Sequence, residues 1–291
     1  MAVVANPEFL QEGAAVKAFL EAERIVIGSD DPGTADRVAA LYGGVDAQVH
    51  SIGLESAELA KYACNSFLST KLSFVNSISA LCELAGADVE EVVAVMGSDS
   101  RIGSQFLRPG PGWGGSCFPK DLAALAHNSA ELGFGFPLLE AVVEANEATF
   151  ARVVNHVAEV VGVLQGSQVA VWGLAFKAGT SDVRNSPALT ICRRLIGLGA
   201  RVVAFDPLVK EVEGIELASS MYEACEGADA LVVLTEWEEF SRADLRQVAK
   251  AAPGAVVIDT RAVIGLAEAA DAGLEVWRLG RPLGGGGTDV G

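Results

Sequence analysis

Basic residues are scarce in this sequence and nowhere concentrated. Its 291 residues include 21 lysines and arginines against 38 aspartates and glutamates, which gives a formal net charge of −17. No run of Lys or Arg stands out, so we expect neither nucleic acid nor an anionic membrane as a partner. An anionic small substrate stays compatible with this balance, because a local basic pocket can lie on an acidic surface.

Paired cysteines and clustered histidines are also missing. The five cysteines form no CxxC pair, and the three histidines are far apart, so no metal site is expected. Unpaired thiols are typical of a reducing cytosol, and we therefore expect a cytoplasmic protein. The chain opens without the charged start of a signal peptide, and no apolar run reaches the length of a membrane span.

The remaining pattern predicts an α/β protein with three regions, at residues 1–52, 53–150 and 151–291. The first region combines short strands at Val3-Val4 and 24–28 with a helix from Phe9 to Phe19 and another beginning at Pro32. Apolar residues at spacings of three and four predict one long helix over 54–85, followed by a shorter helix capped by Asp88. Residues 97–120 are rich in Gly and Pro and read as a loop, and helices follow at 121–132 and 137–164.

From residue 168 the chain alternates between apolar strands and helices. Strands are predicted at 169–172, 201–206, 230–234, 255–259 and 275–278. Such alternation is typical of a doubly wound parallel sheet, which binds ligands beyond the carboxyl ends of its strands. The loops after Gly173, Phe205 and Asp259 are therefore a candidate site.

A cysteine with a nearby cation and carboxylate lies in the central loop. Cys117 follows Gly114-Gly115-Ser116 and precedes Lys120 and Asp121. A nearby cation favours the nucleophilic thiolate, although a small buried cysteine would also fit this position. The preceding residues 110–115 match GxGxxG literally but follow no predicted strand. Because Pro119 argues against a helix opening there, we interpret the match as a false dinucleotide fingerprint.

Other charged residues allow two interpretations each. Lys61 and Asn65 share one face of the long helix, where Lys61 is either a functional amine or an extended surface lysine. Glu8 and Glu12 form a further i, i+4 pair, and acids are also common at helix starts. Lys177, after the strand at 169–172, and the later Arg184 are either phosphate ligands or solvated loop charges.

These motifs together resemble the UDP-glucose/GDP-mannose dehydrogenase family over essentially the whole chain, with wording most similar to its UDP-glucose 6-dehydrogenase branch. The phrases that carry the resemblance are Asn6-Pro7-Glu8-Phe9-Leu10, Lys61-xxx-Asn65, Arg101-Ile102-Gly103, the run from Pro109 to Asp121, and Gly173-Leu174-Ala175-Phe176-Lys177. The resemblance implies an NAD-dependent, two-step oxidation of UDP-glucose to UDP-glucuronate, through a thiohemiacetal and a thioester on one cysteine. It also implies a central helical dimerisation domain and a Rossmann-like C-terminal domain that binds the UDP-sugar.

The resemblance assigns roles to individual residues. Cys117 would be the nucleophile, Lys61 would stabilise oxyanions, Asn65 and Asp121 would position water, and Glu8 would be the base for hydrolysis, supported by Glu12. Arg101 would reach the substrate of a neighbouring subunit, which implies a homodimer. Contacts to the UDP-sugar would come from Phe9, Leu10, Gly112, Trp113, Gly114, Phe176 and Lys177. NAD would be contacted by Lys120 and Arg184.

Two departures from the family pattern matter. The family's Asp-Gly-Arg appears here as Asp259-Thr260-Arg261, and no GxGxxG follows a strand. Residues 1–52 are therefore expected to be the end of an NAD-binding Rossmann domain, with exposed strands at Val3-Val4 and Ile25-Val26-Ile27. The rest of that domain would come from upstream sequence or a partner chain. The alternatives are a non-catalytic UDP-sugar-binding or remnant protein, and a dehydrogenase for GDP-mannose or UDP-N-acetyl-mannosamine.

Overall fold

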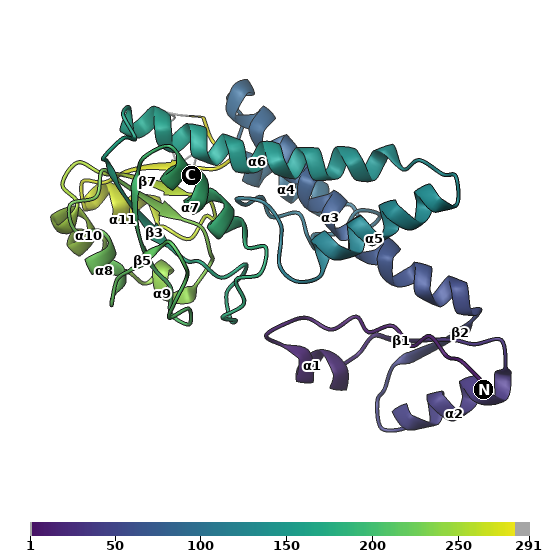
Figure 1. Ribbon diagram of the computed structural model, residues 1–291. Coiled ribbons are helices and arrows are strands. Elements are labelled where there is room, and N and C mark those ends of the chain that lie inside the picture. The colour runs from purple at the N-terminus through teal and green to yellow at the C-terminus, as the bar shows by residue number, and fades with distance from the viewer. Residues whose placement is uncertain (1, 283–291) are drawn as a thin grey trace. The chain divides into compact units, whose positions relative to one another are not determined.

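The computed structural model describes residues 2–282, which form two compact units (Figure 1). Unit 1 contains residues up to 68 together with 120–136, and unit 2 contains 69–119 together with the chain from 137 onward. Helices α3 (Leu54–Ala85) and α5 (Phe118–Glu131) contribute residues to both units. None of the helices between residues 2 and 282 is both long and apolar enough to cross a bilayer.

Unit 1 contains a two-stranded parallel sheet of β1 (Arg24–Gly28) and β2 (Gln48–Ile52). Helix α2 (Pro32–Ala39) follows β1, with Pro32 in its first turn and the Asp31 carboxylate accepting from the Thr34 amide at 3.0 Å. A 3-10 turn (Ala40–Tyr42) precedes β2, and α1 (Ala15–Leu20) precedes β1. The N-cap acid and first-turn proline explain why the helix begins where the sequence predicts.

Three sequence predictions for unit 1 are wrong. Val3-Val4 forms no strand, and only an isolated antiparallel bridge between Ala5 and Gly28 is present there. The helix predicted from Phe9 begins only at Ala15, because Gly13 adopts a positive φ of 78° in the preceding turn. Strand β1 is not exposed: Ile25 and Ile27 pack against Ala35 of α2, and Ile27 is fully buried.

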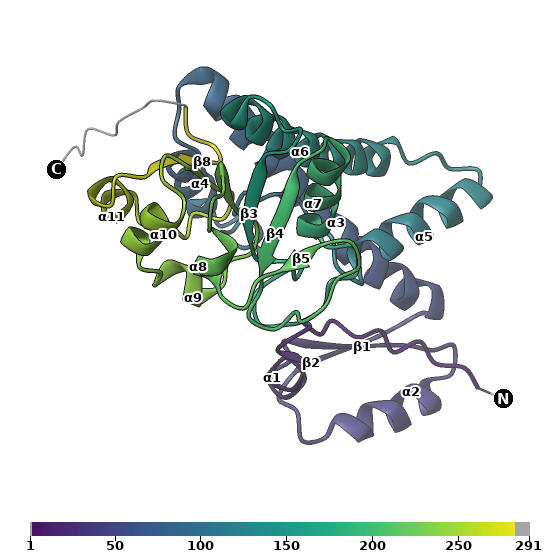
Figure 2. The ribbon, with the colours of Figure 1, turned by 60° about the vertical axis from the view of Figure 1, so that its left-hand side comes forward.

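Unit 2 contains a six-stranded parallel sheet in the order β5-β4-β3-β6-β7-β8, as the strand–helix alternation predicts. Figure 2 labels β3, β4, β5 and β8 of this sheet. Its strands are β3 (Gln168–Trp172), β4 (Arg201–Phe205), β5 (Glu216–Leu217), β6 (Ala230–Val233), β7 (Val256–Asp259) and β8 (Glu275–Arg278). Only β5, an edge strand of two residues, is absent from the prediction. The strand order reverses between β3 and β6, which is where such sheets bind ligands.

Helices cover both faces of this sheet because side chains along a strand alternate in direction. Val169 and Val171 of β3 enter the core beneath α6 (Pro137–Val161) and α7 (Pro187–Gly197). Ala170 and Trp172 enter the opposite core. The helices on that second face are α8 (Met221–Ala224), α9 (Glu238–Ser241), α10 (Leu245–Ala251) and α11 (Leu266–Asp271).

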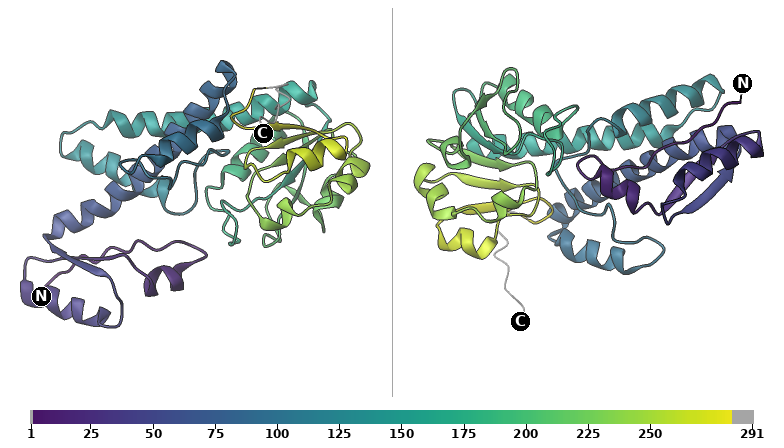
Figure 3. Two further views of the ribbon diagram at one scale, coloured as in Figure 1. Left: turned by 180° about the vertical axis from the view of Figure 1, so that it is seen from behind. Right: turned by 90° about the horizontal axis from the view of Figure 1, so that it is seen from below.

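Within unit 2, the second half of α3 runs beside α6 (Figures 1 and 3). The Ser73 hydroxyl donates to the Val142 carbonyl at 2.8 Å, and Arg152 of α6 pairs with Glu83 of α3 at 3.7 Å. Helix α3 has the bounds that the apolar spacing predicts. Helix α6 continues through residue 150, where the sequence pattern places a domain boundary.

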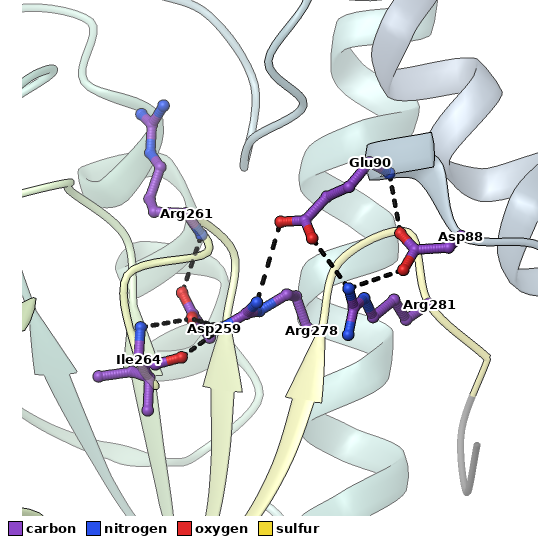
Figure 4. Close-up of polar contacts among 7 residues, drawn as sticks. All are labelled: Asp88, Glu90, Asp259, Arg261, Ile264, Arg278 and Arg281. Carbon is purple, nitrogen blue, oxygen red and sulfur yellow. Dashed lines mark hydrogen bonds and ion pairs between the residues drawn. The ribbon is translucent and has the colours of Figure 1, made fainter. Parts of the chain in front are cut away.

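A cluster of charged residues joins α4 (Val89–Ser98) to the sheet edge (Figure 4). Arg281 Nη2 lies 2.6 Å from the Asp88 carboxylate and 2.8 Å from that of Glu90. Arg278 of β8 lies between Glu90, at 3.8 Å, and Asp259 at the end of β7, at 3.5 Å. Asp88 also caps α4 as predicted, by accepting from the Glu90 amide. These contacts attach α4 to the last two strands.

A buried histidine lies between α6 and β8. His156 stacks on Trp277 with 3.7 Å between ring centroids, and its Nε2 has no hydrogen-bond partner in the described part of the chain. Burial lowers the pKa of His156, an effect that Glu159 opposes and Arg152 reinforces. The neutral ring is therefore the form that the fold favours.

This shift predicts a loss of stability in mild acid. Because the folded pKa of His156 lies below its ordinary value of 6.5, the free energy of unfolding should fall as pH drops from that value toward the folded pKa. His156→Phe, which keeps a ring against Trp277, should reduce this fall in urea unfolding between pH 7.5 and 5.5. The control is His127→Gln, an exposed histidine. An unchanged slope in His156→Phe would contradict the assignment.

Candidate active site

Cys117 is half-buried and directly precedes α5 in the chain, with its Sγ 3.6 Å from the Ser116 hydroxyl. The sequence argument that Pro119 prevents a helix here is wrong, because α5 begins at Phe118 and contains Pro119 in its first turn. A proline is tolerated there since the first helical N–H groups have no partner within the helix. The GxGxxG match at 110–115 still follows no strand in the described chain.

Polar side chains of α3 and α6 hold the loop before Cys117. Asn76 accepts from the Gly110 amide at 2.8 Å, and Ser73 accepts from the Trp113 indole at 2.8 Å. Asn146 of α6 binds the Trp113 backbone twice, accepting from its N–H and donating to its carbonyl, both at 2.9 Å. Trp113, predicted to contact substrate, is itself buried and anchors the loop.

Sequence reasoning missed these anchors, although a signal for them is present. Ser69, Ser73, Asn76 and Ser79 recur at spacings of four and three on α3 and are all buried. A stripe of polar residues at helical spacing inside an apolar pattern indicates a face that binds other polar groups.

The same loop packs against the segment that follows β3. The Gly115 amide donates to the Asn185 carbonyl at 3.3 Å, and a Cβ on Gly114 would lie 1.9 Å from that oxygen. A Cβ on Gly115, which has φ +82°, would lie 2.8 Å from the Phe176 ring. Both glycines are therefore required by close approach of the protein's own backbone and side chains.

One buried carboxylate organises the carboxyl edge of the sheet. Asp206, which follows β4, is 3% exposed and accepts from the amides of Leu174 and Ala175, at 2.8 and 3.1 Å. Its other oxygen accepts from the amides of Leu208 and Val209, at 2.9 and 3.0 Å. The Trp237 indole, from the loop after β6, donates at 3.2 Å to the oxygen that binds Leu174 and Ala175. The loops after Gly173 and Phe205 therefore lie together, as predicted.

The loop after β7 lies at this edge too. The Asp259 carboxylate accepts from the Arg261 amide at 3.0 Å, and Arg261 Nε donates to the Leu234 carbonyl at 3.0 Å (Figure 4 labels Asp259 and Arg261). A Cβ on Gly110 would lie 2.9 Å from Arg261 Nη1. The guanidinium therefore lies against the start of the cysteine loop, although threonine replaces the glycine of the family pattern.

Unit 1 carries a second cluster of predicted residues. The Lys61 ammonium donates to the Glu8 carbonyl at 2.6 Å and lies 3.1 Å from its carboxylate. The Lys61 side chain is 17% exposed, and its Nζ lies 5.4 Å from the Phe9 ring centroid. The Leu10 amide donates to Glu8 at 2.5 Å. Lys61 is thus a partly buried cation with a carboxylate partner, rather than an extended surface lysine.

Asn65 and Asp121 meet within the same unit. Asn65 of α3 donates to the Asp121 carboxylate at 2.5 Å, and both side chains are buried. The adjacent Lys120 ammonium lies 2.6 Å from the other Asp121 oxygen. The i, i+4 spacing of Glu8 and Glu12 does not lie on a helix, because both residues precede α1 and Glu12 lies in the turn before it.

Two predicted cations on loops of unit 2 are paired with acids. Arg101 lies 2.6 Å from Asp99 with its side chain 87% exposed, and Arg184 lies 2.6 Å from Asp182. Lys177 lies over the Phe176 ring at 5.6 Å from its centroid. Gly112 adopts φ +121° beside Phe150 and Asn146.

The other cysteines differ from Cys117. Burial raises the pKa of both Cys192 and Cys225 to about 12, so these thiols stay protonated at neutral pH. Cys82 is buried as well, and burial raises its pKa. Besides Cys117, only Cys64 is half-exposed among the five free cysteines.

Comparison with known families accounts for most of the chain. Residues 1–46 match the NAD binding domain of the UDP-glucose/GDP-mannose dehydrogenase family. Residues 55–148 match its central domain, and residues 170–265 match its UDP binding domain.

Individual relatives agree. The chain is 43% identical to the UDP-glucose 6-dehydrogenase TuaD of Bacillus subtilis over 286 residues, covering 96% of this chain and 62% of that protein. A UDP-glucose dehydrogenase structure from Pyrobaculum islandicum superposes with a TM-score of 0.87 at 34% identity, covering 95% of this chain and 63% of that one. A UDP-D-ManNAc dehydrogenase from Pyrococcus horikoshii superposes with a TM-score of 0.86 at 27% identity, covering 96% and 65%.

The first curated relatives are longer than this chain, which spans 62% to 66% of their lengths. The three domain matches follow one another in a single order along the sequence, and together they include both residue clusters described above. The chain therefore belongs to the UDP-glucose/GDP-mannose dehydrogenase family.

Proposed function

We propose that this protein oxidises UDP-glucose at C6 to UDP-glucuronate in two NAD-dependent steps. The observation that carries the proposal is the placement of Cys117. Its loop is fixed by buried polar contacts and lies against the carboxyl-edge loops of a UDP-binding-type sheet. Relatives at 38% to 43% identity named as UDP-glucose 6-dehydrogenases support the choice of substrate.

The proposed chemistry requires a nucleophilic thiol. Loss of a hydride and a proton converts the C6 alcohol to an aldehyde, and the Cys117 sulfur adds to its carbonyl carbon to give a thiohemiacetal. Loss of a second hydride and proton gives a thioester, which water cleaves to the carboxylate while the thiol is regenerated. NAD supplies the hydride acceptor for both oxidations.

The family resemblance assigns further residues to the oxygen atoms in these steps. Lys61 would stabilise the alkoxide and the tetrahedral oxyanion, since a fixed cation stabilises charge as it develops. Asn65 and Asp121 would orient the attacking water, and Glu8, paired with Lys61, would accept its proton. Glu12 would support Glu8.

The family resemblance assigns several groups to the UDP-sugar. Phe9 and Leu10 follow Glu8, and Gly112 and Gly114 lie in the cysteine loop. Phe176 and Lys177 follow β3 at the position where the sheet order reverses. Trp113 would act indirectly, by anchoring the loop.

The described residues fit NAD only in part. Lys120 and Arg184 are more than half exposed and could turn toward phosphates, although each is now paired with an aspartate. No described strand is followed by a glycine fingerprint. We propose that further dinucleotide-binding sequence, in the same polypeptide or in a second chain, completes the NAD site.

A homodimer is proposed from the exposed face of α3. Phe67, Phe74 and Leu81 recur every seven residues with exposed fractions of 66%, 52% and 58%. A row of large apolar side chains along a helix is typical of a helix-pairing surface. Arg101, highly exposed, would then reach the substrate of the neighbouring subunit. The five free cysteines support a reducing, cytoplasmic location.

Two alternatives have support of their own. The structural likeness to the UDP-D-ManNAc dehydrogenase supports a substrate other than UDP-glucose, and GDP-mannose is a further candidate. A UDP-sugar-binding protein without catalysis is the other, since no strand among residues 2–282 is followed by a glycine fingerprint. Turnover by the chain fused to a relative's NAD-binding domain separates this alternative from the main proposal. UDP-glucose binding in calorimetry without formation of UDP-glucuronate by the fusion would favour the non-catalytic protein.

Replacing the nucleophile should abolish the complete reaction. NADH and UDP-glucuronate are measured with UDP-glucose and NAD, for the chain alone and for the chain fused to a relative's NAD-binding domain. We expect about two NADH per UDP-glucuronate, and a loss of about three orders of magnitude or more in product formation for Cys117→Ser. Cys64→Ser is the matched control and should keep wild-type turnover.

Two outcomes would refute the assignment. One is turnover by Cys117→Ser equal to that of Cys64→Ser. The other is faster oxidation of GDP-mannose or UDP-N-acetyl-mannosamine than of UDP-glucose. That result would keep the proposed reaction but assign it to another substrate.

Charge on the exposed face of α3 should dissociate the dimer. Phe74→Glu places a carboxylate in the apolar row and should shift the mass measured by light scattering from dimer to monomer. Lys17→Glu, on the exposed face of α1, changes charge elsewhere and should leave the mass unchanged. A monomeric wild-type protein would overturn the dimer proposal.

A further inference from the structure

Asn185 makes a backbone contact to the cysteine loop close to Cys117. Gly115, two residues before the nucleophile, donates its amide to the Asn185 carbonyl at 3.3 Å. In a second contact, the Asn185 side-chain amide donates to the Gly115 carbonyl at 3.5 Å. The anchors described on α3 and α6 bind the loop at Gly110 and Trp113, whereas Asn185 binds it at Gly115, closer to Cys117.

Asn185 adopts an uncommon backbone conformation. Its φ of +48° is one of three positive values at non-glycine residues in the described chain, beside Phe106 and Ala262. Asparagine tolerates the left-handed region better than most residues, and β-branched residues tolerate it worst. This conformation sets the direction of the Asn185 carbonyl, which points at the space that a Cβ on Gly114 would fill.

The residues around Asn185 are fixed by the sheet. Ser186 caps α7 by accepting from the Ala188 amide, and its hydroxyl donates to the Leu174 carbonyl at 2.7 Å. The Phe176 amide donates to the Asp182 carbonyl at 3.1 Å. Leu174 is held in turn by Asp206. The hydrogen bonds that hold the segment of Phe176 and Lys177 therefore also hold the segment of Asn185.

We infer that Asn185 is a positioning residue for Cys117: its left-handed backbone fixes the thiol's loop to the segment that carries Phe176 and Lys177. This backbone contact links the placement of the nucleophile to that of the segment proposed to contact substrate. The inference rests on the proposed function for its catalytic meaning, while the contact itself can be tested without substrate.

The test compares Asn185→Val with Asn185→Gly. Valine resists φ near +48°, so the carbonyl should turn away and free the loop, whereas glycine keeps the conformation and the backbone acceptor. Alkylation of Cys117 by iodoacetamide, followed by peptide mass spectrometry at several pH values, should be about tenfold faster in Asn185→Val. It should stay near the wild-type rate in Asn185→Gly. Cys64 is the internal reference in each sample.

A matched strain control separates positioning from general destabilisation. Gly214 has φ +79° in an exposed turn with no atom within 4 Å of a built Cβ, so Gly214→Val introduces similar backbone strain elsewhere. We expect it to lower the melting temperature without changing Cys117 alkylation. Equal alkylation rates in Asn185→Val, Gly214→Val and wild type would overturn the inference, as would an equal acceleration in both valine variants.

Kinetics distinguish this inference from the proposed function. In protein that oxidises UDP-glucose, Asn185→Val should lower kcat about tenfold with a smaller change in KM, and Asn185→Gly should restore kcat. A protein with no UDP-glucose oxidation but with accelerated alkylation in Asn185→Val would refute the function and leave the positioning role intact. Normal kcat in Asn185→Val would refute the role alone.

Discussion

The cysteine loop depends on hydrogen bonds that other elements make to its backbone. Four of the residues from 110 to 115 are glycines, and a loop of this kind has few side chains with which to hold itself. Buried backbone groups must nevertheless find partners. Asn76 and Asn146 supply them from two helices, and Asn185 supplies another from the loop before α7. The loop that precedes Cys117, the proposed nucleophile, is thus held by residues distant in sequence.

The loops at the carboxyl edge of the unit 2 sheet are likewise held through their backbone groups, here by a buried carboxylate. Asp206 accepts from four backbone amides and one indole, drawn from the loops after three different strands. A buried carboxylate is tolerated only when its oxygens are satisfied, and here the donors are the amides that a ligand-binding loop must otherwise expose. The same arrangement recurs at Asp259, which holds the Arg261 loop and pairs with Arg278.

The strong negative charge of the chain has a local counterpart in each unit, where the predicted functional cations are paired with acids. Lys61, Lys120, Arg101 and Arg184 each lie within about 3 Å of a carboxylate. Any anionic ligand of one of these cations must therefore compete with its carboxylate partner. Such pairs keep the cations oriented, and the exposed ones contribute little to stability because water screens them.

Periodicity alone predicts the regular elements well. The long helix at 54–85 and the five longer strands of unit 2 follow from apolar spacing, because each buries a continuous face. The same argument fails at Phe9–Phe19, where Gly13 permits a turn, and at Pro119, where a helix start removes the usual penalty for proline. The apolar run at Arg24–Gly28 does form a buried strand, and the exposure that the family resemblance implied for it is prevented because Ile25 and Ile27 pack against α2.

The residues of the candidate clusters also fall into those that the sequence predicts and those that only the structure reveals. Residue type and motif wording by themselves determine the family and single out Cys117, Lys61, Asn65 and Asp121. Only the tertiary structure decides that Asn146, Asn185 and Asp206 hold the loops, that Trp113 is an anchor, and that Arg184 is paired. The physical reason is that hydrogen bonds between loops join residues tens of positions apart, and local sequence patterns carry information only about neighbours.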